Sequence, residues 1–203
     1  MPDPPQGLQP GTRVFLGLYP SAKTASQIAS LRKSSRTEPL SGIWMNPNDL
    51  HLTVLFGGEQ PEQNLASWQE SAEILQESLS PLLMRHQDRI WDIHWNADRR
   101  LLAMAFDRSS PFWITTGELS RTLSETLLPD KKPRPFWPHL TLARRVLLDP
   151  QTLAFLSETL HSLLEGHPLV WNGVRLYQSV LSPSRTIDRY QALSDLPFSG
   201  SGP

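Results

Sequence analysis

The tripeptide His-Leu-Thr occurs twice in this chain, as His51-Leu52-Thr53 and as His139-Leu140-Thr141. Before each copy, a short apolar stretch is followed by a helical pattern. Val14 and Leu102, which lie in these apolar stretches, precede the two copies by the same number of residues. Because the repeated unit carries the same polar pair at the same place, we predict two similar halves whose polar pairs face each other.

The pattern of apolar residues predicts strands that alternate with helices. Strands are expected over 13–18, 43–45, 50–56, 90–95, 100–107, 139–146, 169–181 and 186–193. Helices are expected over 22–36, from 65 to just before Pro81, and over 112–127 and 153–163. The pair Gly57-Gly58 is expected to end the strand that carries the first tripeptide. This order predicts an α+β fold of bilobal, duplicated strand-helix-strand units, with antiparallel-rich sheets facing a central cleft and the helices outside.

The length of 203 residues suits one bilobal domain over 12–197, with a flexible N-terminus over 1–11 and a flexible C-terminal tail over 198–203. The formal net charge of -1 argues against a general nucleic-acid coat, so any RNA contact is expected to be local. The sequence shows no signal-peptide pattern, and its apolar runs are shorter than the roughly 20 residues that span a bilayer. We therefore expect a cytoplasmic protein without membrane contact, and a monomer.

Cysteine is absent, which excludes disulfides, thiolate nucleophiles and thiolate metal sites. Oxygen and nitrogen side chains must therefore carry any chemistry. The remaining histidines lack a partner of the His-x-Thr kind, and they are interpreted as surface or structural residues: His86, His94, His161 and His167. The chain has no His-Glu-x-x-His or comparable metal spacing, and we expect neither a metal nor another cofactor.

Each His-x-Thr pair suits acid-base chemistry on a strand. Side chains at i and i+2 share a face, so His51 and Thr53 point together, as do His139 and Thr141. Two facing imidazoles can hold opposite protonation states, one taking a proton from a nucleophile and one giving a proton to a leaving group. Displacement at phosphorus needs such groups on opposite sides, and threonine hydroxyls can donate to the non-bridging oxygens.

A run of basic residues without any acidic one accompanies the second tripeptide. The five basic residues are Lys131, Lys132, Arg134, Arg144 and Arg145. Guanidinium groups bind phosphate through paired hydrogen bonds, and Trp137 in the same stretch offers a surface on which a base can stack. The run therefore indicates an anionic substrate.

Two longer segments surround the tripeptides: Asn48 to Thr53 followed by Phe56-Gly57-Gly58, and Arg134 to Arg144. They resemble the two signature motifs of the 2H phosphoesterase superfamily. Within it, the sequence looks most like the bacterial RNA 2′,3′-cyclic phosphodiesterases, also called 2′-5′ RNA ligases. The resemblance in element order extends from Arg13 to Leu196.

The resemblance implies metal-independent hydrolysis of 2′,3′-cyclic phosphates to 2′-phosphomonoesters, with RNA ends or nucleoside 2′,3′-cyclic phosphates as partners. It also implies ATP-independent ligation when the reaction runs in reverse. By motif position, His51 is the proton donor to the departing 3′ oxygen and His139 the acceptor that activates water. Thr53 and Thr141 hold phosphate oxygens and Arg144 assists them. Strict alternation from Thr141 would instead place Arg145 on that face, so the family pattern requires strand twist or a bulge.

The sequence also departs from the family pattern at three places. The family has a bulky residue where this chain has Gly57, and a stretch with glycine and phenylalanine where this chain has Trp91 to Asn96. Trp137 is the unusual residue within the second motif. These departures bear on substrate preference more than on the chemistry.

Three other functions remain open from the sequence. One is hydrolysis of another small cyclic or 2′-5′ linked nucleotide, which the same residues would serve. Another is a non-catalytic module that binds RNA ends. The third is a metallohydrolase in which His51 and His139 are metal ligands.

Overall fold

The computed structural model describes residues 12–31, 42–83, 86, 88, 90–165, 169–179 and 189–198. Its eight strands form one antiparallel sheet with the order β4-β5-β6-β3-β1-β7-β8, and β2 pairs with β6. The strands are β1 (Arg13–Pro20), β2 (Ile43–Trp44), β3 (Leu52–Glu59), β4 (Ile90–Asn96), β5 (Leu101–Phe106), β6 (His139–Arg144), β7 (Trp171–Ser179) and β8 (Tyr190–Pro197).

Four α-helices accompany the sheet in the described residues: α1 (Ala22–Ser30), α2 (Leu65–Leu83), α3 (Pro111–Leu127) and α4 (Pro150–Leu164). Short 3-10 helices precede β3 and α2, at η2 (Pro47–Asp49) and η3 (Glu62–Asn64). Side chains of Ser21, Ser110 and Asp149 accept hydrogen bonds from backbone N–H groups in the first turns of α1, α3 and α4. These caps explain why the helices begin where they do.

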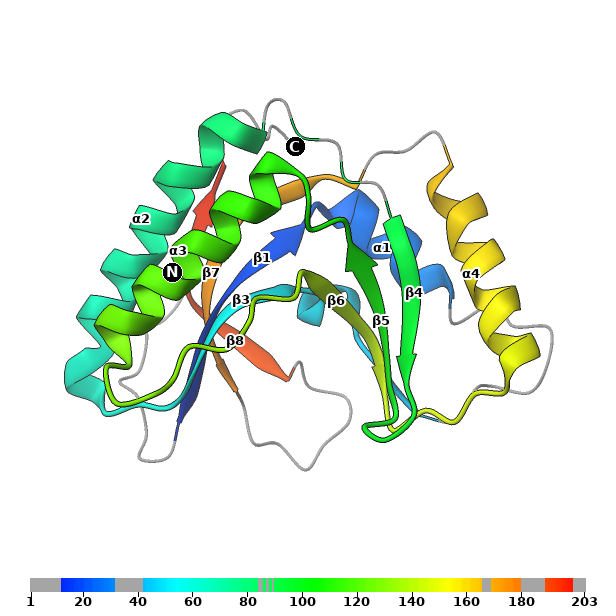
Figure 1. Ribbon diagram of the computed structural model, residues 1–203, viewed down its shortest axis with the longest axis horizontal. Coiled ribbons are helices and arrows are strands. Elements are labelled where there is room, and N and C mark those ends of the chain that lie inside the picture. The colour runs from blue at the N-terminus through cyan, green and yellow to red at the C-terminus, as the bar shows by residue number, and fades with distance from the viewer. Residues whose placement is uncertain are drawn as a thin grey trace, which may run out of the picture.

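The helices pack in two pairs (Figure 1). Helices α2 and α3 contact each other and the strands β3, β7 and β8, while α1 contacts α4, which in turn contacts β4. The core cluster of buried apolar side chains includes residues from all four helices and from β4 at one end of the sheet. At the other end, Tyr190, Leu193 and Leu196 of β8 are partly buried and pack against it. Among the described residues, no helix combines the length and hydrophobicity needed to cross a membrane.

The prediction of an α+β fold with antiparallel strands is confirmed, but the two halves do not form separate sheets. They share one sheet, which is continuous where β3 meets β6. The helices also pack across the two halves. Helix α1 follows β1 in the first half but packs with α4 of the second half, and α3 follows β5 in the second half but packs with α2 of the first half.

Several boundary predictions are wrong. The strand predicted over 139–146 ends at Arg144, and the strand predicted to end at 193 continues to Pro197. Helix α2 runs past Pro81 to Leu83. The helix tolerates this proline because it lies in the last turn, where the proline removes one backbone hydrogen bond and few helical residues follow. Gly57 and Gly58 do not end the strand, which continues to Glu59. Instead β1 pairs Val14 with Gly58 and Phe15 with Phe56, so Gly57 is the extra residue of a bulge.

Several predicted segments lie outside the described residues. These are the termini 1–11 and 199–203, residues 32–36 at the end of the first predicted helix, residues 180–181, and residues 186–188 at the start of the last predicted strand.

A buried carboxylate joins three elements of the core. Asp88, which precedes β4, accepts hydrogen bonds from Nε2 of His86 at 2.7 Å and from Nε1 of Trp113 at 2.7 Å. Nε1 of Trp171 donates to the same carboxylate. His86 is thus a structural residue, as the sequence predicted, and Trp113 and Trp171 are core residues with satisfied indole N–H groups.

Candidate active site

The two His-x-Thr motifs lie side by side on the sheet. Strands β3 and β6 pair through Leu52 and Leu140, and both leucines are fully buried in the core. Neighbouring residues of a strand point to opposite faces. The opposite face of the sheet therefore carries the four polar residues of the motifs: His51, Thr53, His139 and Thr141. In this antiparallel register, each histidine lies across from the threonine of the other motif.

Both imidazoles are held in the same tautomer by the backbone. Nδ1 of His51 lies 2.7 Å from the carbonyl oxygen of Asp49, and Nδ1 of His139 lies 2.8 Å from that of Trp137. A carbonyl oxygen can only accept, so Nδ1 carries the proton in each ring. Nε2 of the neutral ring is then free of a proton, and this nitrogen can take or give a proton during a reaction.

His51 is enclosed by three aromatic rings. The ring centroids of Phe15, Tyr190 and Tyr177 lie 4.7, 4.9 and 5.3 Å from that of His51. Burial among them lowers the pKa of His51 to about 4, and the charges of Arg144 and His139 act in the same direction. The hydrogen bond to Asp49 opposes this shift but does not outweigh the burial. His51 is therefore neutral at pH 7 in the unliganded protein.

His139 is less enclosed and rests on the indole of Trp137. The two rings are stacked, with centroids 4.1 Å apart and planes 17° from parallel. Burial lowers the pKa of His139 below its usual 6.5, and the charges of Arg144 and His94 add to this effect. Arg144 thus acts on the pKa of both histidines, which places its charge within reach of each.

A bulge in β6 accounts for the position of Arg144. Strand β5 pairs Ala103 with Thr141 and Leu102 with Ala143, so Leu142 is an extra residue that the partner strand does not match. This bulge resets the alternation and brings Arg144 to the face that bears Thr141. The following residue, Arg145, lies beyond the strand with a left-handed φ of 56°. Strict alternation fails here because of the bulge.

Strand β3 has a bulge at the same place after its own threonine. Strand β1 pairs Gly17 with Thr53 and Leu16 with Leu55, which leaves Val54 unmatched. The bulge brings Phe56 to the face of Thr53, and its side chain is 51% exposed there. An exposed aromatic ring on this face offers a surface for a nucleobase.

Gly17 packs closely against β3 and Tyr177, next to the first histidine. A Cβ atom at this position would lie 3.0 Å from the backbone oxygen of Leu52, 3.3 Å from the ring of Tyr177 and 3.6 Å from Cδ2 of His51. The backbone oxygen belongs to a central strand and cannot easily move. A side chain at Gly17 would therefore press on the backbone of β3 and on the ring of Tyr177, which encloses His51.

Asp49 positions the first histidine from two sides. Its backbone oxygen accepts the proton of His51 Nδ1, and its side chain, only 1% exposed, accepts from the backbone N–H groups of Arg189 and Tyr190. The carboxylate thus fixes the start of β8, whose Tyr190 ring contacts His51 edge-on. Reasoning from the sequence assigned no role to Asp49, Phe15 or Tyr190, because their contacts join elements that are distant in the chain.

Of the basic residues in the predicted run, Arg144 is the one whose charge lowers the pKa of both histidines. Nζ of Lys131 donates to the backbone oxygen of Gly57 at 3.0 Å, and Lys132 and Arg134 are exposed. The departure at Gly57 has a packing reason. A Cβ atom there would lie 2.5 Å from the ring of the fully buried Trp68, so a bulky residue would displace that indole.

The described residues do not bring potential metal ligands together. Within the described ranges, no set of three or more His, Cys, Asp or Glu side chains could hold a metal ion together.

Comparisons with known proteins bear on the fold. No protein-family model matches the sequence, and no curated protein matches it. The structure of apo E. coli LigT matches with 21% identity and a TM-score of 0.59, over 93% of this chain and 98% of that chain. The structure of TT0787 of Thermus thermophilus matches with 22% identity and a TM-score of 0.62, over 94% of this chain and 100% of that chain.

The chain has the LigT fold. A structure of E. coli LigT complexed with 3′-AMP also matches, with 20% identity and a TM-score of 0.59, over 94% of this chain and 99% of that chain. The resemblance read from the two motifs is therefore confirmed at the level of the LigT fold, which includes nearly the whole chain.

Proposed function

We propose that this chain hydrolyses RNA 2′,3′-cyclic phosphate ends to 2′-phosphomonoesters, and that nucleoside 2′,3′-cyclic phosphates are its smallest substrates. The observation that carries the proposal is the matched pair of imidazoles, each with Nδ1 bonded to the backbone and each within reach of the charge of Arg144. E. coli LigT, which has the same fold, has been crystallised with phosphate and with 3′-AMP. A phosphate-bearing nucleotide as substrate agrees with both observations.

In the proposed reaction, a water molecule attacks phosphorus as the bond to the 3′ oxygen breaks. Nε2 of His139 takes the proton of the water, and Nε2 of His51 gives a proton to the departing 3′ oxygen. The hydroxyl groups of Thr53 and Thr141 donate hydrogen bonds to the non-bridging oxygens, and Arg144 balances their negative charge. The phosphate remains on the 2′ oxygen.

The reaction needs one protonated imidazole, whereas burial keeps both neutral in the unliganded protein. A phosphodiester anion bound between the rings favours the positively charged imidazolium form, so its binding promotes uptake of the proton that the reaction needs. His51 is the more deeply buried of the two, and charges interact most strongly where water is excluded. The bound anion therefore raises the pKa of His51, as its proposed role as the acid requires.

The same residues serve 2′-5′ ligation, in which an RNA 5′ hydroxyl replaces water as the group that attacks phosphorus and a 2′-5′ linkage forms without ATP. Neither reaction requires a cofactor or a metal in this scheme. Activity that persists in the presence of a chelator is expected. Loss of activity in the chelator with recovery on adding a divalent metal would favour the metallohydrolase instead.

The test is incubation of the wild-type protein with a nucleoside 2′,3′-cyclic phosphate and identification of the monoester isomer. The proposal expects the 2′-phosphate alone. Formation of the 3′-phosphate would contradict the assigned direction of attack. RNA-end binding without turnover would favour a binding module, and turnover only of other cyclic or 2′-5′ linked nucleotides would change the substrate.

A further inference from the structure

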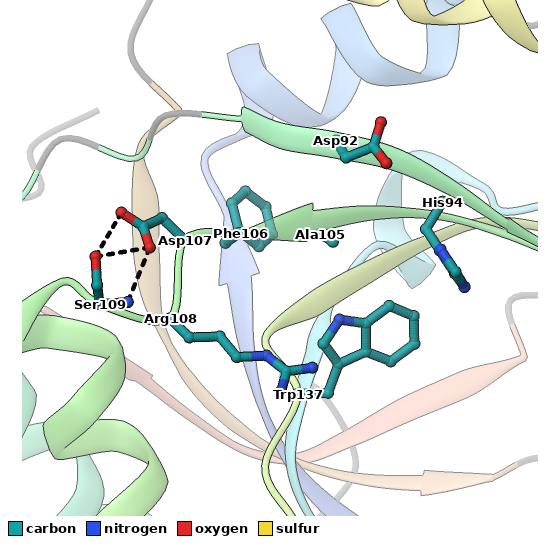
Figure 2. A pocket seen from close by; sticks show the side chains of 8 residues that line it. All are labelled: Asp92, His94, Ala105, Phe106, Asp107, Arg108, Ser109 and Trp137. Carbon is teal, nitrogen blue, oxygen red and sulfur yellow. Dashed lines mark hydrogen bonds between the residues drawn. The ribbon is translucent and has the colours of Figure 1, made fainter.

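A cavity of about 670 Å³ is lined in part by Trp137, which stacks on His139, and therefore lies on that side of the candidate active site. Figure 2 shows the residues that line it. Its walls come from β4, β5, the loop that follows β5, and the segment before β6. The lining residues are Asp92, His94, Ala105, Phe106, Asp107, Arg108, Ser109 and Trp137. A volume of this size suits a small organic ligand such as a nucleoside.

The cavity shares two residues with the surroundings of His139. Trp137 lines the cavity and stacks on the imidazole, and Ala105 lines the cavity and pairs with His139 in the sheet. The ring of His94 meets that of Trp137 edge-on, at a centroid distance of 5.2 Å. His51 lies on the opposite side of the motif pair, among Phe15, Tyr177 and Tyr190. A ligand in the cavity would therefore approach the phosphorus from the side of His139.

The charges of the lining favour a nucleobase over a phosphate. Arg108 extends toward Trp137 in Figure 2, and it has no ion-pair partner in the part of the chain that the structure describes. Two carboxylates, Asp92 and Asp107, line the same space and would repel an anion. The Asp107 carboxylate already accepts hydrogen bonds from the backbone N–H and hydroxyl of Ser109.

The groups that remain include Asp92 as an acceptor, Arg108 as a donor, the imidazole of His94 and the indole of Trp137 as an apolar surface. A nucleobase presents donors and acceptors along its edge and a flat face for stacking. Three of the lining residues, Asp92, His94 and Trp137, also stand where the sequence departs from the 2H phosphoesterase pattern. The cavity is thus built partly from residues that the proposed hydrolysis does not use.

We propose that this cavity binds a second nucleoside, whose 5′ hydroxyl replaces the attacking water beside His139. This inference rests on the proposed function and assigns the place where the acceptor of its 2′-5′ ligation binds. The 5′ oxygen forms a bond to phosphorus as the bond from phosphorus to the 3′ oxygen breaks. The hydroxyl proton passes to Nε2 of His139, and the proton of His51 passes to the 3′ oxygen. The phosphodiester count is unchanged, so no ATP is consumed.

The test uses a short RNA that carries a 5′ phosphate and a 2′,3′-cyclic phosphate, so that it cannot join to itself. Adenosine is supplied as the acceptor, and glycerol at the same concentration is an alcohol without a base. The measured quantity is the ratio of ligated product to hydrolysed 2′-phosphate within one reaction. A change in overall rate cancels from this ratio.

We expect the wild-type ratio to be about tenfold higher with adenosine than with glycerol, as one well-formed set of base contacts would give. Arg108→Ala and Asp92→Asn should each lower the adenosine ratio by about tenfold. Arg99→Ala and Asp98→Asn make the same charge changes at exposed positions of the β4–β5 connection, and they should leave the ratio unchanged. Equal ratios for adenosine and glycerol, or for the wild type and both cavity variants, would overturn the inference.

A binding measurement separates this inference from the proposed function. Calorimetric titration of the wild-type protein with adenosine should show binding that Arg108→Ala weakens and Arg99→Ala does not. If adenosine binds in this way but no cyclic phosphate is hydrolysed, the proposed function fails and the nucleoside site stands. If hydrolysis occurs but adenosine neither binds nor is ligated, the nucleoside site fails alone.

Discussion

Leu52 of β3 lies opposite Leu140 of β6, and in the described part of the chain this pair is where the two strands join. Both side chains are fully buried. Each leucine is the middle residue of a His-x-Thr motif, so the apolar pair on one face sets the spacing of the polar groups on the other. The core and the candidate active site therefore depend on the same two residues.

Shortening one of these leucines should disturb both the core and the candidate active site. Leu140→Ala leaves a cavity under the site, and the free energy of unfolding should fall by about 2–5 kcal/mol. Urea unfolding measures this change. Leu147→Ala, at a side chain that is largely exposed, is the matched control and should change stability by less than about 0.5 kcal/mol. Equal stability of the two variants would contradict the packing described.

The stability of the protein should decrease in mild acid because of His51. Its pKa is about 4 in the folded protein and 6.5 in the unfolded chain, so the unfolded state binds more protons between these values. Stability is highest above pH 6.5 and falls as the pH decreases toward 4. From pH 7 to pH 5, His51 alone accounts for a loss of about 2 kcal/mol, and His139 acts in the same direction.

Urea unfolding at pH 7 and pH 5 tests this dependence. His51→Gln removes the titrating group at the same position, so the difference between the two pH values should shrink by about 2 kcal/mol. An unchanged difference in this variant would mean that His51 is not buried in its neutral form.

The pH dependence of catalysis should differ between kcat/KM and kcat. The former reports the unliganded enzyme, in which the pKa of each histidine lies below 6.5, so its maximum is expected below pH 6.5. A bound phosphodiester anion raises both pKa values, so kcat should peak at a higher pH. Initial rates measured against substrate concentration at each pH give the two profiles. Coincident maxima, or rates that stay flat between about pH 5 and 8, would contradict a role for two histidines.

Removing the Asp49 carboxylate should loosen the aromatic enclosure of His51. Asp49→Ala leaves the N–H groups of Arg189 and Tyr190 without their acceptor, and unfolding should become easier by about 1–3 kcal/mol. The pKa of His51, followed by NMR, should move up toward 6.5 as water reaches the ring. Asp98→Ala, at an exposed aspartate, serves as the control. A variant that loses stability while the pKa of His51 stays at about 4 would show that Asp49 does not position the ring.

The sequence predicted the local features of this fold well. Helical spacing identified α2 and α3, and the repeated tripeptide located two strands that turn out to be neighbours. The features it missed depend on contacts between distant segments. The exchange of α1 and α3 between the halves, the carboxylate of Asp49 on β8 and the bulge after Thr53 leave no periodic signal. The bulge after Thr141 leaves none either, and it was expected, as an alternative to strand twist, only because the family pattern places Arg144 beside Thr141. Gly57 is a partial exception, because a glycine in a strand suggests a bulge or a close approach.

The central claim is that His51 and His139 act in one reaction, and turnover of a nucleoside 2′,3′-cyclic phosphate by their asparagine variants tests it most directly. Asparagine keeps a donor for the carbonyl of Asp49 or Trp137 and removes Nε2. Each of His51→Asn and His139→Asn should lower kcat by about 10²–10⁴-fold, and the double variant should be little worse than either single one, because the two groups act as a unit. Near-wild-type kcat in either folded single variant would contradict the claim.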